Sequence, residues 1–299
     1  MKWHSARLGR CRKKREQAKK GEGSLMDIKQ KPKVPVTDAD KAKRYFKYYD
    51  REAAFMAPQK MGKVFGPPMN PADAVPFAER ASILEEGFSK NEIGYCVMPD
   101  GTGYIADETF IAGGTAEMVD WYIAWRGLDP LRYVIVNPHE NLSAMSMQTC
   151  YAKDEDRTLQ EKYWDTTQVI MKSGPMGPST DYLNFKCPSS VGFDMIKIGP
   201  DKETKTLICG RNYAKGFPPQ AAPDYFVCHQ VKEAPGGVNV TTRIWYGWSV
   251  RYGLDHKALP DGFWMQPHVP MTLMIGNAVE WANVAAILPL VYREEKDNF

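Results

Sequence analysis

The amino-acid sequence predicts an α+β fold in which a curved antiparallel sheet grips one long C-terminal helix. From residue 132 onward, short runs of alternating apolar residues are separated by Pro, Gly and Asp, which is typical of antiparallel strands. Residues 269–289 instead repeat apolar side chains at helical spacing. Several strands followed by a long apolar helix favour this class, and a cavity between sheet and helix usually holds an apolar ligand.

The first third of the chain is predicted to be mainly helical. The pair Thr37-Asp38 is a helix-capping signal and opens a predicted helix over 38–60. A loop rich in Pro and Gly follows over 61–75, and a short helix over 76–90. The stretch "GYCVMPDGTGYIADETFI" then predicts a hairpin with a tight turn at Asp100-Gly101.

The remaining elements are predicted in the order helix, strands, helix. Thr115 opens a helix that Gly127 ends. The predicted strand segments are "RYVIVN", "SAMSMQTCYA", "YWDTTQVIMK", "DYLNFKCP", "TKTLICGRNY" and "DYFVCHQVKEAPGGVNVTTRIWYGWSV". The last of these is a hairpin that turns at 235–237. The C-terminal helix has Pro270 in its first turn and is predicted to stop at Pro289.

Composition and charge place the chain among ordinary globular proteins with a basic N-terminal tail. Hydrophobic residues make up 43% and charged residues 25% of the 299 residues. The 12% of aromatic residues favours, weakly, a site for a flat apolar ligand. Residues 1–33 carry a net charge of +9 against +3 for the whole chain, which leaves −6 for the rest. We expect a disordered, solvated tail; the alternative for such a basic run is binding to nucleic acid or to a membrane. The acidic body argues against a nucleic-acid-binding core, so no nucleic-acid partner is expected.

Cysteine usage and hydropathy indicate a cytoplasmic protein. The six cysteines are scattered without a CxxC pair, as expected of reduced thiols. The N-terminus lacks the apolar core of a signal peptide. The sequence shows no apolar run of about 18 residues, so no membrane partner is expected.

The stretch "RYVIVNPHEN", residues 132–141, is predicted to be a strand that ends at the rim of a site. An apolar run stops at Asn137-Pro138, and polar residues follow at once. His139 would be a catalytic base at such a rim, but it would equally be a plain turn residue.

Three segments resemble the family of diacetylphloroglucinol and phloretin hydrolases. They are "GGTAEMVDWYIAWRGLDPLRYVIVNPHEN", "FVCHQVKEAPGGVNVTTRIWYG" and "NAVEWANVAAILPLVYREE", and the resemblance covers roughly residues 40–295. It implies a helix-grip fold like that of the birch-pollen allergen, with a small helical N-terminal domain used for dimerisation. It also implies an enzyme that cuts the bond between an acyl group and a phenolic ring with a zinc-bound water, in a retro-Claisen-type hydrolysis.

The zinc ligands that the resemblance implies are mostly missing from this sequence. The family holds the metal with two His and two Glu, and the matching positions here are Asn141, Met171 or Lys172, Gly276 and Glu280. Only Glu280 is a ligand type, with His139 as a replacement two residues away on the same strand face. Two ligands hold zinc poorly, so no cofactor is expected, or zinc only if the site is rebuilt with His139 and Glu280.

Lys172 and Glu280 are predicted to pair in place of the metal. Glu280 lies on an otherwise apolar helix face, where a lone carboxylate is costly to bury. A desolvated Lys172 would act as a general acid or polarise a carbonyl; the alternative is a surface lysine at a strand end. Tyr133 matches a family position that bonds the phenolic substrate. We therefore predict His139, Lys172, Glu280 and Tyr133 as catalytic.

Five further residues are predicted to bind the substrate: Asn141, His229, Tyr246, Tyr122 and Asn277. The strand face of His229 is ambiguous, and a structural histidine is the more common outcome. Arg126 closes its helix, where a cation suits the helix dipole, and is therefore interpreted as structural.

The expected organisation is a tail over 1–33, a helical dimerisation domain over 34–112 and a cavity domain over 113–299. The N-terminal helical part carries an aromatic cluster, which favours a homodimer because one short helix cannot bury it alone: Tyr45, Phe46, Tyr48, Tyr49 and Phe55.

Two functions are compatible with the sequence. The first is an enzyme that hydrolyses the C–C bond of an acylated phenolic ketone, or a related metal-free acid–base lyase or isomerase. The second is a protein that binds a flat aromatic or polyketide ligand without catalysis. Measured metal content and turnover of phenolic ketones would discriminate between them.

Overall fold

A computed structural model describes residues 31–174, 177–214 and 224–299. Lys33–Phe299 form one compact unit. In the described chain, an eight-stranded antiparallel sheet has the strand order β1-β2-β8-β7-β6-β5-β4-β3. The strands are β1 Ile93–Val97, β2 Gly103–Ala112, β3 Asn141–Ser146, β4 Thr167–Gly174, β5 Gly177–Lys186, β6 Thr204–Ala214, β7 Tyr225–Ala234 and β8 Gly237–Tyr246. A separate hairpin pairs β9 Trp248–Arg251 with β10 Leu254–Lys257.

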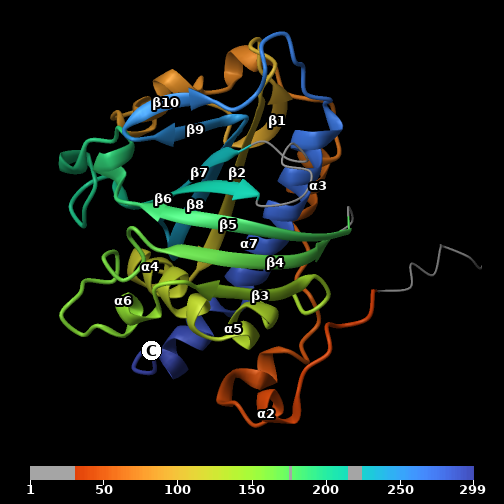
Figure 1. Ribbon diagram of the computed structural model, residues 1–299, viewed down its shortest axis with the longest axis vertical. Helices are drawn as coiled ribbons and strands as arrows, with labels where there is room; N and C mark the ends of the chain where they lie inside the picture. Colours follow the sequence, from red (N-terminus) through yellow and green to blue (C-terminus); the bar gives the residue numbers. More distant parts are fainter. Residues whose placement is uncertain (1–30, 175–176, 215–223) are drawn as a thin grey trace, which may run out of the picture. The chain divides into compact units, whose positions relative to one another are not determined.

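The C-terminal helix α7, His268–Glu295, runs across one face of this sheet (Figure 1). Its buried side chains include Met274, Trp281 and Leu288, which belong to the core shared with the sheet. The predicted helix-grip α+β class is therefore confirmed. Burial of this apolar stripe is what holds the helix against the sheet, since apolar area removed from water is the main favourable term.

Alternation along the strands gives the sheet two cores. On β7, Val227 and Val231 face α7, whereas Phe226 and Cys228 face the other side. The second core is closed by the N-terminal segments around η3 Phe77–Leu84. His229 shares the odd-numbered face of β7, so its side chain points toward α7.

The predicted strand over 132–137 is wrong. Pro130–Val134 form helix α5, with Asp129 as N-cap accepting from the Leu131 amide (2.9 Å). The strand begins only at Asn141, after the turn that contains His139. Asp before Pro at a first helical position is a helix-start signal, and it overrides the β-branched composition of the run.

The predicted helix over 38–60 is broken into three pieces. They are α2 Asp38–Lys41, the 3-10 helix η1 Arg44–Tyr48 and α3 Pro58–Val64. The capping box at Thr37 is present, since its hydroxyl accepts from the Asp40 amide (3.1 Å). The break follows from packing, because Tyr45, Tyr48 and Tyr49 turn inward and are buried in the main core.

Other local predictions are confirmed. The hairpin β1–β2 turns at Asp100-Gly101, with Gly101 at a positive φ of 83°. Thr115 caps α4, Ala116–Trp125, and accepts from the Met118 amide (3.2 Å). The helix ends at Trp125, and a 3-10 turn η4, Arg126–Leu128, follows. The segment predicted as a strand at 143–152 is only partly correct, since it contains the end of β3 and then most of a short helix α6, Thr149–Lys153.

The expected division at residue 112 does not coincide with a structural boundary. Strands β1 and β2 lie before it but belong to the main sheet, where β2 pairs with β8 along ten residue pairs from Gly103↔Tyr246 to Ala112↔Gly237. The compact unit accordingly extends from Lys33. The predicted tail over 1–33 lies almost wholly outside the described residues.

Helix α7 also corrects one sequence expectation. Pro289 does not stop the helix but lies inside it, and the helix continues to Glu295. Within the described ranges, α7 is also the single helix long and apolar enough to cross a membrane by length and composition. The core helix of a soluble protein passes the same test, so this is weak evidence for a membrane span.

Candidate functional site

Glu280 of α7 is the centre of a buried polar cluster on the face of the sheet that packs against the helix. Lys172 of β4 donates to Glu280 Oε2, and the Tyr133 hydroxyl of α5 donates to the same oxygen (3.0 Å). Arg126 Nη1 lies 3.7 Å from Glu280 Oε1. We call these four residues the Glu280 cluster. The predicted contact between Lys172 and Glu280 is therefore present.

Four separate elements bring these side chains together. Lys172 is two residues along β4 from the buried Ile170 and so shares its inward face. Arg126 follows Tyr122 by one helical turn and continues the buried face of α4. Asn141 pairs with Lys172 across β3 and β4, and its amide donates to the Tyr133 carbonyl (3.1 Å). This bond fixes α5, and with it the Tyr133 ring, next to β3.

The two cations keep Glu280 charged. Burial alone would raise the pKa of Glu280, but Lys172 and Arg126 outweigh it and the pKa is lowered. Burial would likewise lower the pKa of Lys172, but the Glu280 carboxylate raises it. Solvent still reaches the pair, since 30% of the Lys172 side chain and 14% of the Glu280 side chain are exposed. The cluster is thus an accessible ion pair within a low-dielectric setting.

His229 faces the same region as a neutral imidazole. Burial lowers its pKa to about 3, with a further lowering by Arg126. Its Nδ1 is 2.8 Å from the Thr242 hydroxyl, and its ring meets the edge of Trp281 at 5.1 Å. These contacts satisfy the ring while leaving it beside the cluster, so the structural and the binding interpretations of His229 both fit its position.

Three tyrosines add aromatic walls to the cluster. Tyr122 is buried under Arg126, whose guanidinium lies 5.4 Å from the ring centre. Tyr246 lies beside Tyr225, with ring centres 5.7 Å apart. Tyr225 was missed by the sequence interpretation, although its position four residues before His229 on β7 places both on one face.

Arg126 is the other residue of this region that the sequence interpretation missed. It was assigned to the helix dipole, but it is 5% exposed and its Nε donates to Gln168 Oε1 (3.0 Å). The available signal was its spacing: residues four apart share a helix face, and Tyr122 lies on the apolar face.

Two predicted site residues lie elsewhere. Asn277 donates to Asp107 Oδ2 (2.7 Å), and Lys60 pairs with Asp107 Oδ1 (2.5 Å), which makes a separate polar cluster between α7, β2 and α3. His139 lies in the turn before β3, where its backbone amide reaches Asn137 Oδ1 (3.4 Å). The structure does not place His139 in the Glu280 cluster.

The residues present do not fit the zinc that the resemblance implies. Of the four matching positions, Gly276 has no side-chain donor, and the Asn141 amide donates to the Tyr133 carbonyl. The Lys172 ammonium contacts Glu280, where a dication would be repelled. Within the described residues, no group of three or more His, Cys, Asp or Glu could hold a metal ion.

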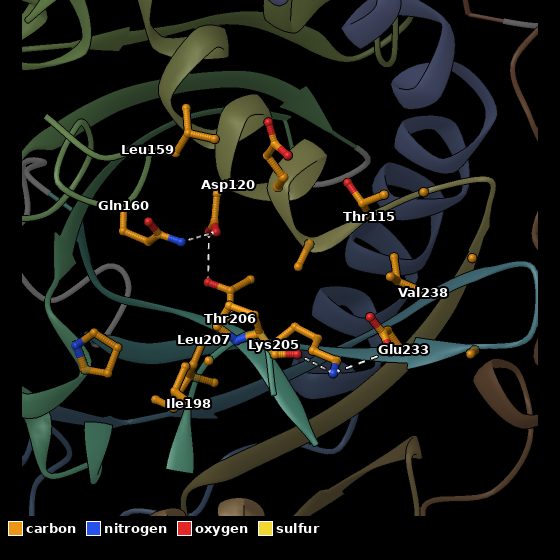
Figure 2. A pocket seen from close by; sticks show the side chains of 18 of the residues that line it. Thr115, Asp120, Leu159, Gln160, Ile198, Lys205, Thr206, Leu207, Glu233 and Val238 are labelled. Carbon is orange, nitrogen blue, oxygen red and sulfur yellow. Dashed lines mark hydrogen bonds and ion pairs between the residues drawn. The ribbon is translucent and has the colours of Figure 1, made fainter. Parts of the chain in front are cut away.

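A large surface hollow lies apart from this cluster. It has a volume of about 870 Å³ and is lined by the start of α4 and by parts of β6 and the β7–β8 hairpin. Figure 2 shows Asp120 at this hollow, bonded to Gln160 (2.6 Å) and Thr206 (2.9 Å). The Tyr163 hydroxyl donates to the same carboxyl (2.8 Å). Burial raises the pKa of Asp120 to about 7, despite these donors.

Comparisons with known proteins agree on one family. Residues 75–293 match the family model described as the DAPG hydrolase PhiG domain. A phloretin hydrolase of Eubacterium ramulus is 34% identical over 270 residues, which cover 89% of this chain and 96% of that protein. A 2,4-diacetylphloroglucinol hydrolase of Pseudomonas sp is 26% identical over 226 residues, covering 71% of this chain and 74% of the relative.

Solved structures are more distant. Ara h 8.0201 aligns with a TM-score of 0.36 and 10% identity over 62% of this chain and 99% of that chain. The di-domain ARO/CYC StfQ from the steffimycin biosynthetic pathway aligns with a TM-score of 0.36 and 13% identity, over 67% of this chain and 53% of its own.

Proposed function

Because the chain belongs to the family of DAPG hydrolase PhiG domains, we propose that it hydrolyses the C–C bond between an acyl group and a phenolic ring without a metal. Its relatives are named hydrolases of phloretin and of 2,4-diacetylphloroglucinol. The observation that carries the metal-free part is the contact of Lys172 with Glu280, at positions where the resemblance implies metal ligands.

The cluster supplies the groups that this reaction needs. Water adds to the acyl carbonyl, the C–C bond breaks, and its electron pair passes to the ring carbon, which takes a proton. The products are a carboxylic acid and a phenol. Lys172 and Arg126 are positioned to stabilise the oxyanion of the tetrahedral adduct, as preformed charges do in a site of low dielectric.

Proton transfer is assigned to Glu280 and Tyr133. The Glu280 carboxylate takes a proton from the attacking water, and the Tyr133 hydroxyl gives its proton to the ring carbon. Since Tyr133 is bonded to Glu280 (3.0 Å), the proton returns from Glu280 to Tyr133 and closes the cycle. The lowered pKa of Glu280 makes it a weak base, so the rate should rise with pH while the carboxylate forms.

Turnover of phloretin by protein dialysed against a chelator tests this proposal. We expect products by liquid chromatography, and a loss of at least about 100-fold in kcat/KM on Tyr133→Phe or Glu280→Gln. Lys205→Met is the matched control, because Lys205 pairs with Glu233 at the start of β6, the opposite end of that strand from Ala214, which pairs with Asp181. Loss of activity on chelation, with recovery on adding zinc, would return the protein to metal-dependent hydrolysis.

The alternative is a binding protein for a flat aromatic ligand. The replacement of metal-ligand positions by Lys172 and Gly276 favours it, because a lost metal often means lost hydrolysis while an aromatic-lined site persists. Binding of phloretin by calorimetry without any turnover, at every metal tested, would select this function.

A further inference from the structure

The Glu280 cluster holds two cations against one anion. Lys172 contacts Glu280 directly, and the Arg126 guanidinium lies 3.7 Å from the other carboxylate oxygen. Arg126 is nearly inaccessible, with 6% of its side chain exposed. Its other neighbours include the neutral Gln168 amide and the rings of Tyr122, Tyr133 and Phe185. One buried positive charge is therefore left without a counter-ion in the cluster.

Among the residues that the structure describes, the other charged or titratable groups facing this region do not cancel that charge. His229 on β7 is neutral, and the nearby Tyr122, Tyr133, Tyr225 and Tyr246 have raised pKa values and stay protonated. Asp107 on β2 is paired with Lys60. Asp181 on β5 accepts from Asn212 (3.1 Å) and lies toward Tyr225 and Tyr246. The region is thus positive at Lys172 and Arg126 and negative at Asp181.

We propose that the cluster binds its phenolic ligand as the phenolate, with the oxygen anion at Lys172 and Arg126, and that Arg126 sets this preference. The inference rests on the proposed function only for the class of ligand. A phenolate fits better than another anion because the same cations lie against aromatic rings: Lys172 Nζ is 5.5 Å and the Arg126 guanidinium 5.8 Å from the Tyr133 ring centre. A second ring of the ligand can stack among these walls.

The expected lowering of the pKa of the bound phenol can be bounded. An opposite charge within about 4–6 Å lowers the pKa of an acid by about 1–3 units. Glu280 already compensates one of the two cations, so the net effect on the ligand is that of a single positive charge. A bound phenol should therefore ionise about one unit lower than in water.

The probe is 4-nitrophenol, whose anion absorbs visible light. Its absorbance is titrated against pH with excess protein and without protein. We expect the pKa of the bound phenol to fall by about one unit, which is tenfold in the ionisation constant. Arg126→Gln should remove most of this shift, and Asp181→Asn should enlarge it because a negative charge is lost. Lys205→Met, at the start of β6 and outside the Glu280 cluster, should leave the shift unchanged.

The opposite signs for Arg126 and Asp181 keep the test decisive even if one variant does not fold. The proposal would be overturned if 4-nitrophenol does not bind, or if its bound pKa is equal to or above its free pKa. It would also be overturned if Lys205→Met changes the pKa shift as much as Arg126→Gln does. Hydrolysis of phloretin without a phenolate preference would remove this inference and leave the proposed function. Phenolate binding without hydrolysis would leave this inference and remove the proposed function.

Discussion

Glu280 is in contact with both cations of its cluster, so its loss should cost more stability than the loss of either cation. Glu280→Gln leaves Lys172 and Arg126 without a counter-charge, whereas Lys172→Met leaves Glu280 facing Arg126 at 3.7 Å. Breaking a fully buried pair costs about 3–5 kcal/mol. Because Lys172 is 30% exposed, we expect about 2–3 kcal/mol for Glu280→Gln and about 1 kcal/mol for Lys172→Met, measured by urea unfolding.

The double variant Lys172→Met with Glu280→Leu tests the charge explanation. It leaves one unpaired cation, Arg126, which keeps its bond to Gln168. We therefore expect it to be more stable than Glu280→Leu alone. If the two single costs simply add, the pair is not energetically coupled and the explanation fails.

Asp120 should make the protein less stable as the pH rises toward neutrality. Its folded pKa is about 7 against an ordinary pKa of 3.8, so the folded carboxyl keeps its proton between about pH 4 and 7 while the unfolded one loses it. The contribution of this group to the free energy of unfolding therefore falls as pH rises through that window, on the order of 1.4 kcal/mol per pKa unit.

Asp120→Asn should abolish this dependence. The amide oxygen can still accept from Tyr163 and Thr206, and Gln160 can turn its own oxygen toward the new amide. We expect the variant to gain stability relative to the native protein between pH 5 and pH 8, by up to a few kcal/mol. If the urea midpoints of the native protein and of Asp120→Asn change with pH in parallel, Asp120 does not titrate in this range.

Side chains could be placed from the sequence where a single local rule applies. A lone carboxylate on an apolar helix needs a cation, and that argument is enough to place Lys172 beside Glu280. Arg126 could not be placed by the same means, because a cation at a helix end also has a satisfactory solvent-exposed role. Only the tertiary fold shows that the end of α4 is buried, with Arg126 at 5% exposure.

At the scale of elements, α7 tolerates a proline that should weaken it. Pro289 has no amide hydrogen to donate to the Ala285 carbonyl, and its ring crowds that turn, yet the helix continues to Glu295. Burial of Leu288 and Val291 on either side compensates for the defect. We expect Pro289→Ala to raise the free energy of unfolding by about 1–3 kcal/mol, measured by denaturant unfolding.

Ala286→Pro is the matched opposite change. Ala286 is an exposed position of the same helix, so a new proline there removes a hydrogen bond without gaining any contact. We expect a loss of about 3 kcal/mol. If Pro289→Ala is also destabilising, the proline ring contributes packing that outweighs the missing bond.

The wrong strand prediction at 132–137 follows from the burial of this segment. Residues 131, 133, 134, 135 and 136 are all buried, and a helix that is buried on every side shows no amphipathic period. The β-branched residues of this run then favour a strand by composition alone. Hairpins were easier to predict, since Asp100-Gly101 and 235–237 specify their turns locally through residues that accept a positive φ.

At the scale of the whole molecule, the homodimer stays a prediction, but most of the aromatic cluster that favoured it is buried within one chain. Tyr45, Tyr48 and Tyr49 are buried within one chain, where Tyr45 packs on Trp125 at 5.3 Å. Phe55 at 85% and Phe65 at 61% remain exposed in this part. Light scattering should give twice 33.8 kDa, and Phe55→Ser with Phe65→Ser should shift the mass toward the monomer. A monomeric native protein at micromolar concentration would contradict it.

The position at which the folded body begins can be tested by truncating the N-terminus. Residues 1–30 lie outside the described structure, and their composition predicts that they are dispensable. The body begins just beyond them. Lys33 Nζ donates to the Tyr49 carbonyl (2.8 Å), and the Tyr49 hydroxyl donates to the Val34 carbonyl (2.7 Å). The Val34 amide donates to the Pro138 carbonyl (2.7 Å), next to the turn that leads into β3.

Two truncations that differ by six residues should therefore behave differently. Removing 1–30 should leave the melting temperature and any activity unchanged, because the contacts of Lys33 and Val34 remain. Removing 1–36 takes away three hydrogen bonds, each contributing about 0.5–1.5 kcal/mol, and exposes apolar surface that Val34 and Val36 cover. At about 2–4 °C per kcal/mol for a chain of this size, we expect a fall of roughly 5–10 °C in a thermal scan. An equal fall for both truncations would show that the basic tail itself packs on the body.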